Sequence, residues 1–256
     1  MATRILVLAA GKGTRMKSDL PKVAHKVAGV PMVRHVLAAA ATLDPESVTV
    51  VIAPGEEGEQ VRALLAGSER TVVQSQRLGT GHAVRCAAEG ETFAAEDAVA
   101  VLYGDTPLLR PATIHAMLKA LHEDPACAVV VMGFRPTDPG QYGRLVMDGP
   151  FLKEIVEFAE ASPEQKAITL CNAGIMLFRG GPLAGLLAAI GNSNAKGEYY
   201  LTDAVAIARA EGHRCLVVEA EEEEVLGVNS RAELAQAEAI FQRRLRHNAM
   251  AQGVTM

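Results

Sequence analysis

Short, largely apolar segments alternate with amphipathic segments along the first half of the chain. Apolar runs of strand length lie at residues 5–8, 47–53, 70–74, 98–103 and 126–133. Segments with helical spacing lie at residues 31–43, 56–66, 79–89 and 111–122. Strands without polar alternation are typical of sheets covered on both faces. The pattern therefore predicts an α/β fold with a doubly wound, mostly parallel, Rossmann-like sheet.

The rhythm changes near residue 136. Further strands are predicted at residues 142–147, 153–158, 170–178 and 213–220, with a short strand or turn at 225–229. Helices are predicted at residues 162–166, 182–190, 198–211 and 231–250. Because the strict strand–helix alternation stops here, we interpret this part as a small substrate-facing β insertion rather than a new repeat.

Composition narrows the class of protein. A net charge of −5 argues against a general nucleic-acid binder. The apolar runs are far shorter than the roughly 20 residues that span a bilayer, so no membrane partner is expected. The four cysteines are scattered without a Cys-x-x-Cys pair, which predicts buried thiols in a reducing cytoplasm and no zinc site.

The segment after the first strand carries glycines and cations. Gly11 and Gly13 permit the positive φ angles that turn backbone N–H groups into an anion-binding concavity. Lys12, Arg15 and Lys22 add three positive charges nearby. Taken alone, Gly-x-Gly could be an ordinary solvated turn between a strand and a helix. The whole string suits the phosphates of a nucleotide.

Spacing excludes two well-known phosphate loops. A Walker A loop places its lysine after the second glycine, whereas Lys12 lies between Gly11 and Gly13. The dinucleotide-binding fingerprint needs a third glycine where this chain has Met16.

Asp105 follows the predicted strand 98–103 and precedes Thr106-Pro107. Ligands of such sheets bind beyond the carboxyl ends of the strands, so Asp105 is a candidate Mg²⁺ ligand. The alternative is an N-cap of the next helix. Asn229 offers a neutral oxygen as a second ligand beside the Asp105 carboxylate, although Asn229 or Ser230 could instead cap the last helix.

Further motifs occur in a fixed order along the chain. They are Leu-Gly-Thr-Gly-His-Ala at 78–83, Tyr-Gly-Asp at 103–105, Tyr-Gly-Arg at 142–144, Cys-Asn-Ala-Gly-Ile at 171–175, Gly-Glu-Tyr-Tyr-Leu-Thr-Asp at 197–203 and Gly-Val-Asn at 227–229. Together with the glycine loop they resemble the sugar-nucleotide pyrophosphorylases. The closest resemblance is to the uridylyltransferase half of the bacterial bifunctional N-acetylglucosamine-1-phosphate uridylyltransferase/glucosamine-1-phosphate acetyltransferases.

The resemblance implies a Mg²⁺-dependent nucleotidyltransferase. UTP and N-acetylglucosamine 1-phosphate would give pyrophosphate and UDP-N-acetylglucosamine, a precursor of peptidoglycan and lipopolysaccharide. It also implies a nucleotidyltransferase domain at residues 1–228, with a nucleotide half at about 1–135 and a sugar-binding part at about 136–228. Residues 229–256 would form the C-terminal helix and linker. The family's left-handed β-helix of hexapeptide repeats is missing, so we expect no acetyltransferase activity and leave the oligomeric state open.

Site residues carry over position by position from the resemblance. The implied nucleotide-binding residues are Leu8, Ala9, Ala10, Gly11, Lys22, Gln74, Gly79, Thr80, Tyr103, Gly104 and Asp105. The implied sugar-binding residues are Gly143, Glu157, Asn172 and Asn229. Catalysis would involve Arg15, Lys22 and Asp105, and Mg²⁺ would be held by Asp105 and Asn229.

One position departs from the family pattern. Where a lysine is expected two residues after Glu157, this chain has Ala159. Lys153 and Lys166 are the candidates to take its place in binding the sugar phosphate. Two alternatives to the leading function therefore stay open: the same fold acting on a different sugar or alcohol phosphate, and a catalytically weak UTP-binding regulatory protein.

Overall fold

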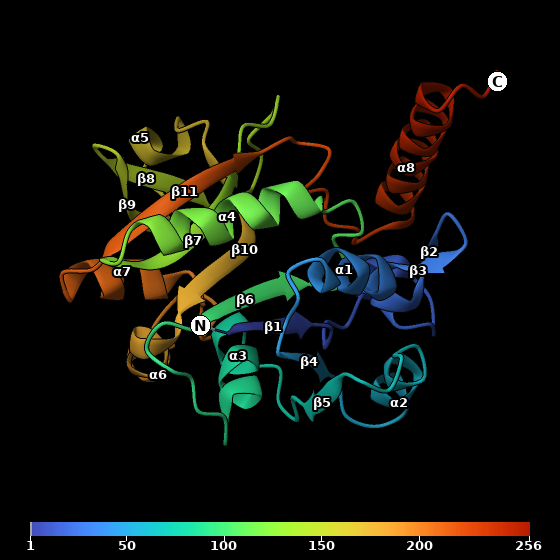
Figure 1. The fold of residues 1–256 in the computed structure, drawn as a ribbon. Coiled ribbons are helices and arrows are strands. Elements are labelled where there is room, and N and C mark those ends of the chain that lie inside the picture. Colours follow the sequence, from blue (N-terminus) through green and yellow to red (C-terminus); the bar gives the residue numbers. More distant parts are fainter. Residues whose placement is uncertain (1) are drawn as a thin grey trace.

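A computed structural model describes residues 2–256, and its apolar runs form a central sheet between two layers of helices (Figure 1). The strands are β1 (Thr3–Leu8), β2 (Lys26–Val27), β3 (Val30–Pro31), β4 (Ser47–Ile52), β5 (Arg70–Val73), β6 (Ala98–Tyr103), β7 (Cys127–Phe134), β8 (Arg144–Asp148), β9 (Phe151–Val156), β10 (Cys171–Arg179) and β11 (Arg214–Ala220). The helices are α1 (Met32–Ala41), α2 (Glu56–Arg62), α3 (Thr80–Ala88), α4 (Pro111–Glu123), α5 (Pro163–Lys166), α6 (Gly180–Ala189), α7 (Asp203–Ala210) and α8 (Arg231–Ala251), with 3-10 turns η1 (Thr14–Met16) and η2 (Lys22–Ala24).

The main sheet has the strand order β11-β7-β10-β6-β1-β4-β5. Strand β1 pairs in parallel with both β4 and β6. Strand β5 pairs in parallel with β4, and β11 pairs in parallel with β7. Only β10 runs against its neighbours along this path through the described residues. β8 and β9 form an antiparallel extension from β10. The predicted doubly wound, mostly parallel sheet with a β insertion is confirmed.

Both faces of the sheet are buried, which explains the unbroken apolar runs. On β1, Ile5 and Val7 pack into a core with helices α1, α2 and α4. Leu6 points to the other face, where helices α3, α6 and α7 supply the partners. Because side chains alternate along a strand, each face receives every second residue. The two cores fix the sheet edge at which β1 and β6 end.

One predicted helix begins later than its sequence suggests. Residues 198–202 belong to no helix, and α7 starts at Asp203. The backbone of Tyr199 is instead committed to the start of α3: Tyr199 N donates to Leu78 O at 2.8 Å, and Gly81 N donates to Tyr199 O at 2.8 Å. A long-range pairing of this kind leaves no pattern in the local sequence. The predicted strand or turn at 225–229 forms no strand, and the β2–β3 hairpin was not predicted.

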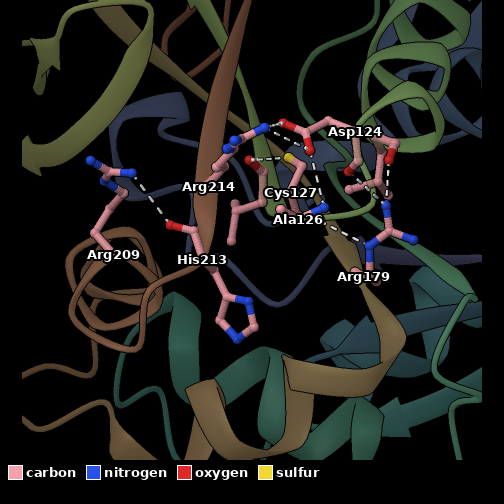
Figure 2. Close-up of polar contacts among 9 residues, drawn as sticks. Asp124, Ala126, Cys127, Arg179, Arg209, His213 and Arg214 are labelled. Carbon is pink, nitrogen blue, oxygen red and sulfur yellow. Dashed lines mark hydrogen bonds and ion pairs between the residues drawn. The ribbon is translucent and has the colours of Figure 1, made fainter.

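Arginine side chains tie the sheet together at the edge where β7 and β11 begin and β10 ends (Figure 2). Arg179, only 7% exposed, donates to Cys127 O at 2.9 Å and to Asp124 O at 3.1 Å. Arg214 forms an ion pair with Asp124 at 3.3 Å and donates its backbone N–H to Ala126 O. These bonds join α4, β7, β10 and β11. The cluster therefore holds these four elements together at this edge of the sheet.

Helix α8 docks on a third, smaller core. Its Ala237 and Ile240 pack with Val27 and Met32 from the start of the chain. Its N-cap is Ser230, whose side chain accepts from Glu233 N at 3.3 Å. Asn229 is therefore free of the capping role. Strands β10 and β11, from the predicted sugar-binding part, lie within the main sheet. The predicted division of the chain into a nucleotide half, a sugar-binding part and a C-terminal helix, at about residues 135 and 228, stays a prediction.

Candidate active site

A cavity of about 360 Å³ opens where β1, β5 and β6 end. All the predicted nucleotide-binding residues except Gly104 line it. The remaining lining residues are Val23, Arg77, Ala83, Glu198 and Asn229. The residues that the resemblance implies for nucleotide binding therefore lie together, at the carboxyl ends of parallel strands where ligands of such sheets bind.

Gly104 lies behind the cavity wall. Its N–H donates to Leu8 O at 3.0 Å, and a Cβ there would lie 3.1 Å from Val23 Cγ1. The position needs a small residue so that the ends of β6 and β1 can approach. Packing alone therefore accounts for a glycine here, and the role of Gly104 in nucleotide binding stays a prediction.

The glycine loop uses its two glycines differently. Gly13 has a φ of 59°, and a Cβ on it would lie 2.7 Å from Lys22 Cβ. Gly11 does not have positive φ, contrary to the anion-nest prediction, and is an exposed residue on the cavity wall. The loop thus folds closely around Lys22, while the side chains of Lys12 and Arg15 are exposed.

Lys22, Asp105 and Asn229 converge between the loops. The Lys22 ammonium forms an ion pair with the Asp105 carboxylate and donates to Asn229 Oδ1 at 2.9 Å. Asn229 is itself held by two bonds, from its N–H to Glu233 Oε2 at 2.8 Å and from Nδ2 to Gly227 O at 3.2 Å. A carboxylate and an amide oxygen therefore face the same cation.

This pair of donors fits Mg²⁺, which usually takes one or two oxygens from the protein and the rest from phosphate and water. The Lys22 ammonium stands in the structure where such a cation would be held. Among residues 2–256, no group of three or more His, Cys, Asp or Glu side chains forms an alternative metal site. The assignment of Asp105 and Asn229 to the metal remains a prediction.

A second cavity of about 450 Å³ adjoins the first. It contains all four predicted sugar-binding residues and also Arg15. The two cavities share Tyr103, Asp105 and Asn229. Arg15, which the resemblance implies in catalysis through contact with the triphosphate, lines the second cavity rather than the first.

Backbone and side-chain bonds fix the second cavity's polar groups. Asn172 N donates to Gly143 O at 2.8 Å, and Asn172 Oδ1 accepts from Gly174 N at 2.9 Å. Glu157 Oε1 accepts from Thr202 Oγ1 at 3.3 Å. The segments around Gly143, Glu157 and Asn172 thus place a fixed carboxylate and a fixed amide on the wall of this cavity.

Tyr103 forms part of the wall between the cavities. Burial, together with the negative charge of Asp105, raises the pKa of its phenol, so the hydroxyl stays neutral at physiological pH. The ring lies against Gly174, where a Cβ would be 3.1 Å from Tyr103 Cε2. Tyr103 is therefore a packed, neutral partition.

Neither Lys153 nor Lys166, the candidates to replace the lysine expected at Ala159, lines the second cavity. Lys166 Nζ lies 4.9 Å from the centre of the Phe158 ring, and Lys153 lies on a different cavity beside Glu154. Among the described residues that line the second cavity, Arg15 is the sole Lys or Arg. The phosphate of a sugar phosphate bound here would therefore have Arg15 as its cation within the cavity, with Lys22 beside the shared Asp105 as the next.

Sequence reasoning missed Arg77. Its Nε donates to Ala10 O at 2.6 Å, and its guanidinium pairs with Glu57, so it braces the first cavity's wall. Its position between Gln74 and Gly79 was the available signal, but nothing in the sequence shows that its side chain reaches back to the loop.

These features define a nucleotidyltransferase: a glycine loop at the carboxyl edge of a parallel sheet, and two cavities that meet at one carboxylate. The chain belongs to the family of MobA-like NTP transferase domains, whose profile matches residues 5–170. Among curated proteins, the chain is 54% identical to the "Bifunctional protein GlmU" of Rhodospirillum rubrum, with 99% of the chain aligned. It is 50% identical to the protein of that name from Paramagnetospirillum magneticum, over 98% of the chain.

The chain spans 56% and 55% of the length of those two relatives. The resemblance deduced from its motifs is thereby confirmed for the aligned part. Two solved structures share the fold. One, provisionally named a glucose-1-phosphate thymidylyltransferase, from Bacillus anthracis, has a TM-score of 0.75 at 20% identity and covers 93% of this chain and 95% of its own. The other, a CMP:2-keto-3-deoxy-manno-octonic acid synthetase complexed with CTP, has a TM-score of 0.69 at 18% identity, with coverage of 95% and 100%.

Among residues 2–256, none of the helices combines the length and apolar character needed to cross a membrane.

Proposed function

We propose that the protein transfers a uridylyl group from UTP to N-acetylglucosamine 1-phosphate in a Mg²⁺-dependent reaction, giving UDP-N-acetylglucosamine and pyrophosphate. The observation that carries the proposal is the pair of cavities that share Tyr103, Asp105 and Asn229. A nucleotide in the first cavity and a sugar phosphate in the second would meet at this wall. The 54% identity to a protein named bifunctional GlmU supports the choice of substrates.

In the proposed reaction, an oxygen of the sugar phosphate attacks the α-phosphorus of UTP. The new O–P bond forms as the bond from that phosphorus to the β,γ-pyrophosphate breaks. Since the attacking phosphate is already an anion, no general base is required. Arg15 and Lys22 reduce the repulsion between the two anions and stabilise the charge that develops on the phosphate oxygens.

Asp105 and Asn229 would hold Mg²⁺, which supplies charge neutralisation when bound. The chain's own contribution is to present these two oxygens on separate loops. Val228 N donates to Asp105 O at 2.9 Å, so the loop after β6 and the loop before α8 keep a fixed spacing.

The test is pyrophosphate release from UTP with Mg²⁺ and a panel of sugar 1-phosphates. Release confined to N-acetylglucosamine 1-phosphate is expected, and would show that Ala159 is tolerated. Preference for another sugar would overturn the acceptor and assign the change in specificity to residues 157–160. Bound UTP without release from any acceptor would favour a regulatory protein.

Asp105→Asn tests the carboxylate itself. We expect its kcat to fall by at least about 100-fold, which corresponds to ~2.7 kcal/mol of transition-state stabilisation. Asp148→Asn is the matched control, because Asp148 pairs with Arg209 on a different cavity. A near-normal rate in Asp105→Asn would contradict the metal assignment.

A further inference from the structure

The Gln74 side chain is anchored on one side only. Gln74 follows β5, is 5% exposed and lines the first cavity. Its backbone N–H donates to Ile52 O at 2.9 Å, which fixes where the side chain starts. Its Nε2 donates to Gly79 O at 3.1 Å and lies 3.1 Å from His82 Nδ1.

An amide NH₂ group has two hydrogens to donate, and the structure offers it two acceptors. Gly79 O can only accept a hydrogen bond. His82 Nδ1 can accept the second hydrogen when the ring proton is on Nε2. Among the described residues, no partner contacts Gln74 Oε1, and this atom is not among the buried polar atoms without a partner. The amide oxygen is therefore the group left for a ligand.

His82 acts from behind the cavity. It is the third residue of α3 and is absent from the described residues that line the cavity. Cys86, one turn further along α3, places its sulfur 3.8 Å from His82 Nε2. The Tyr199 ring lies at a centroid distance of 6.3 Å from the imidazole. The ring is thus held by its own helix and by the 197–202 loop.

The direction of the amide decides which pyrimidine can bind. Uracil carries an N–H at ring position 3, whereas cytosine carries a lone pair there. A fixed amide oxygen accepts from uracil and repels cytosine, but a freely rotating amide could turn its NH₂ group toward cytosine. We infer that His82 is a positioning residue that selects uridine over cytidine nucleotides by holding the NH₂ group of Gln74 away from the base. This inference rests on the proposed function, with the base of UTP at Gln74, one of the nucleotide-binding residues that the resemblance implies.

The test compares UTP with CTP in two variants of His82. His82→Phe keeps a ring and removes the acceptor, and we expect the UTP preference, as a ratio of kcat/KM values, to fall by about tenfold, the usual weight of one hydrogen bond. His82→Asn places an amide oxygen near the former Nδ1 and should keep most of the preference. Calorimetric binding of both nucleotides provides a readout independent of turnover.

A merely structural role would lower activity with both nucleotides equally, and that result in His82→Phe would overturn the inference. Thermal unfolding followed by circular dichroism shows whether each variant is folded. Should His82→Phe fail to fold, ¹⁵N shifts of the wild-type imidazole decide: an unprotonated Nδ1 supports the inference, and a protonated Nδ1 overturns it.

Gln74→Ala separates this inference from the proposed function. If the wild type binds CTP as tightly as UTP, or if Gln74→Ala keeps the UTP preference, base reading at Gln74 fails and the inference fails with it. If Gln74→Ala loses the preference and His82→Phe keeps it, only the inference about His82 fails.

Discussion

At the scale of single residues, the Lys22 ammonium has two possible partners. In the structure it contacts Asp105 and Asn229, whereas in the proposed reaction the same oxygens face Mg²⁺. Two cations cannot share this small space without repulsion. Binding of the metal therefore requires Lys22 to move toward the phosphates, where its charge is needed.

Lys22→Met should reveal this competition. We expect the nucleotide-free variant to bind Mn²⁺ about tenfold more tightly than wild type, ~1.4 kcal/mol, because the cation that neutralises Asp105 is gone. Electron paramagnetic resonance of free Mn²⁺ measures the affinity directly. Lys153→Met, on a different cavity, is the control. Unchanged or weaker Mn²⁺ binding in Lys22→Met would show that Lys22 does not compete with the metal.

Sequence reasoning reached the members of this site but not their contacts. Asp105 was predicted from its place at the end of a buried strand, and Lys22 from a basic loop. Their contact joins residues 83 positions apart in the chain, so only the packed sheet reveals it. His82 lies within the motif at residues 78–83, yet its contact with Gln74 depends on the orientation of α3. Sequence patterns indicate that a residue lies at the carboxyl edge of the sheet, but they do not indicate which side chains contact one another there.

At the scale of elements, Asp97 ties the starts of two central strands. It is 3% exposed and accepts from Ala2 N at 2.9 Å, from Ala94 N at 3.0 Å and from Arg4 Nε at 3.3 Å. The bond from Ala2, followed by those from Ala94 and Arg4, lowers the pKa of the Asp97 carboxyl below its usual value against the opposing effect of burial. The ionised form is therefore favoured by folding.

Asp97→Asn should destabilise the protein in a pH-dependent way. Because the pKa of Asp97 is lower in the folded state, its contribution is fully present above the unfolded pKa of about 3.9 and is lost as pH falls through the folded pKa. We expect a loss of about 1–3 kcal/mol at pH 7. Urea unfolding at pH 7 and below pH 4 should show this difference shrinking in acid. A constant difference would mean that the charge is unimportant.

The junction between α3 and the 197–202 loop depends on Gly81. A Cβ on Gly81 would lie 2.9 Å from Tyr199 O, the acceptor of its own N–H bond. Gly81→Ala should therefore cost about 1–3 kcal/mol by overpacking. Gly185→Ala in α6 is the matched control, since a Cβ there has no neighbour within 4 Å, and should stabilise by about 0.5–1 kcal/mol. Chemical denaturation of both variants measures these changes; equal stabilities would contradict the close contact at Gly81.

The same junction explains why one element was misplaced. Residues 198–211 have helical composition, but the backbone of Tyr199 bonds to Leu78 and Gly81, and Leu201 N donates to Thr80 Oγ1 at 3.1 Å. Strands with strictly apolar runs, such as β6, were placed at their exact bounds, 98–103. Burial on two faces leaves a strong local signal, whereas a loop paired to a distant helix leaves none.

At the scale of the molecule, the C-terminal helix braces the N-terminal loop. Arg231, at the start of α8, donates from Nε to Met16 O at 3.1 Å, next to Arg15. Further along α8, the side chain of Glu238 accepts from Ala28 N at 2.5 Å. In Figure 1 the red α8 stands beside the blue elements of the chain's start. Residues from both ends of the sequence therefore shape the candidate site: α8 contacts Asn229 on one side and the segment 14–16 on the other.

Arg231→Met should loosen this arrangement without unfolding the sheet. Loss of the bond to Met16 O removes one charge-assisted contact, for which we expect a fall in kcat of about tenfold, ~1.4 kcal/mol, because Arg15 is held less firmly for the transition state. Hydrogen–deuterium exchange should rise at residues 14–17 and stay unchanged in β1 and β6. Arg246→Met, exposed near the far end of α8, should leave both kcat and exchange as in wild type. If Arg231→Met and Arg246→Met have the same kcat, α8 contributes only to the fold. If only Arg231→Met slows turnover, the contact from α8 to Met16 O positions Arg15 for the reaction.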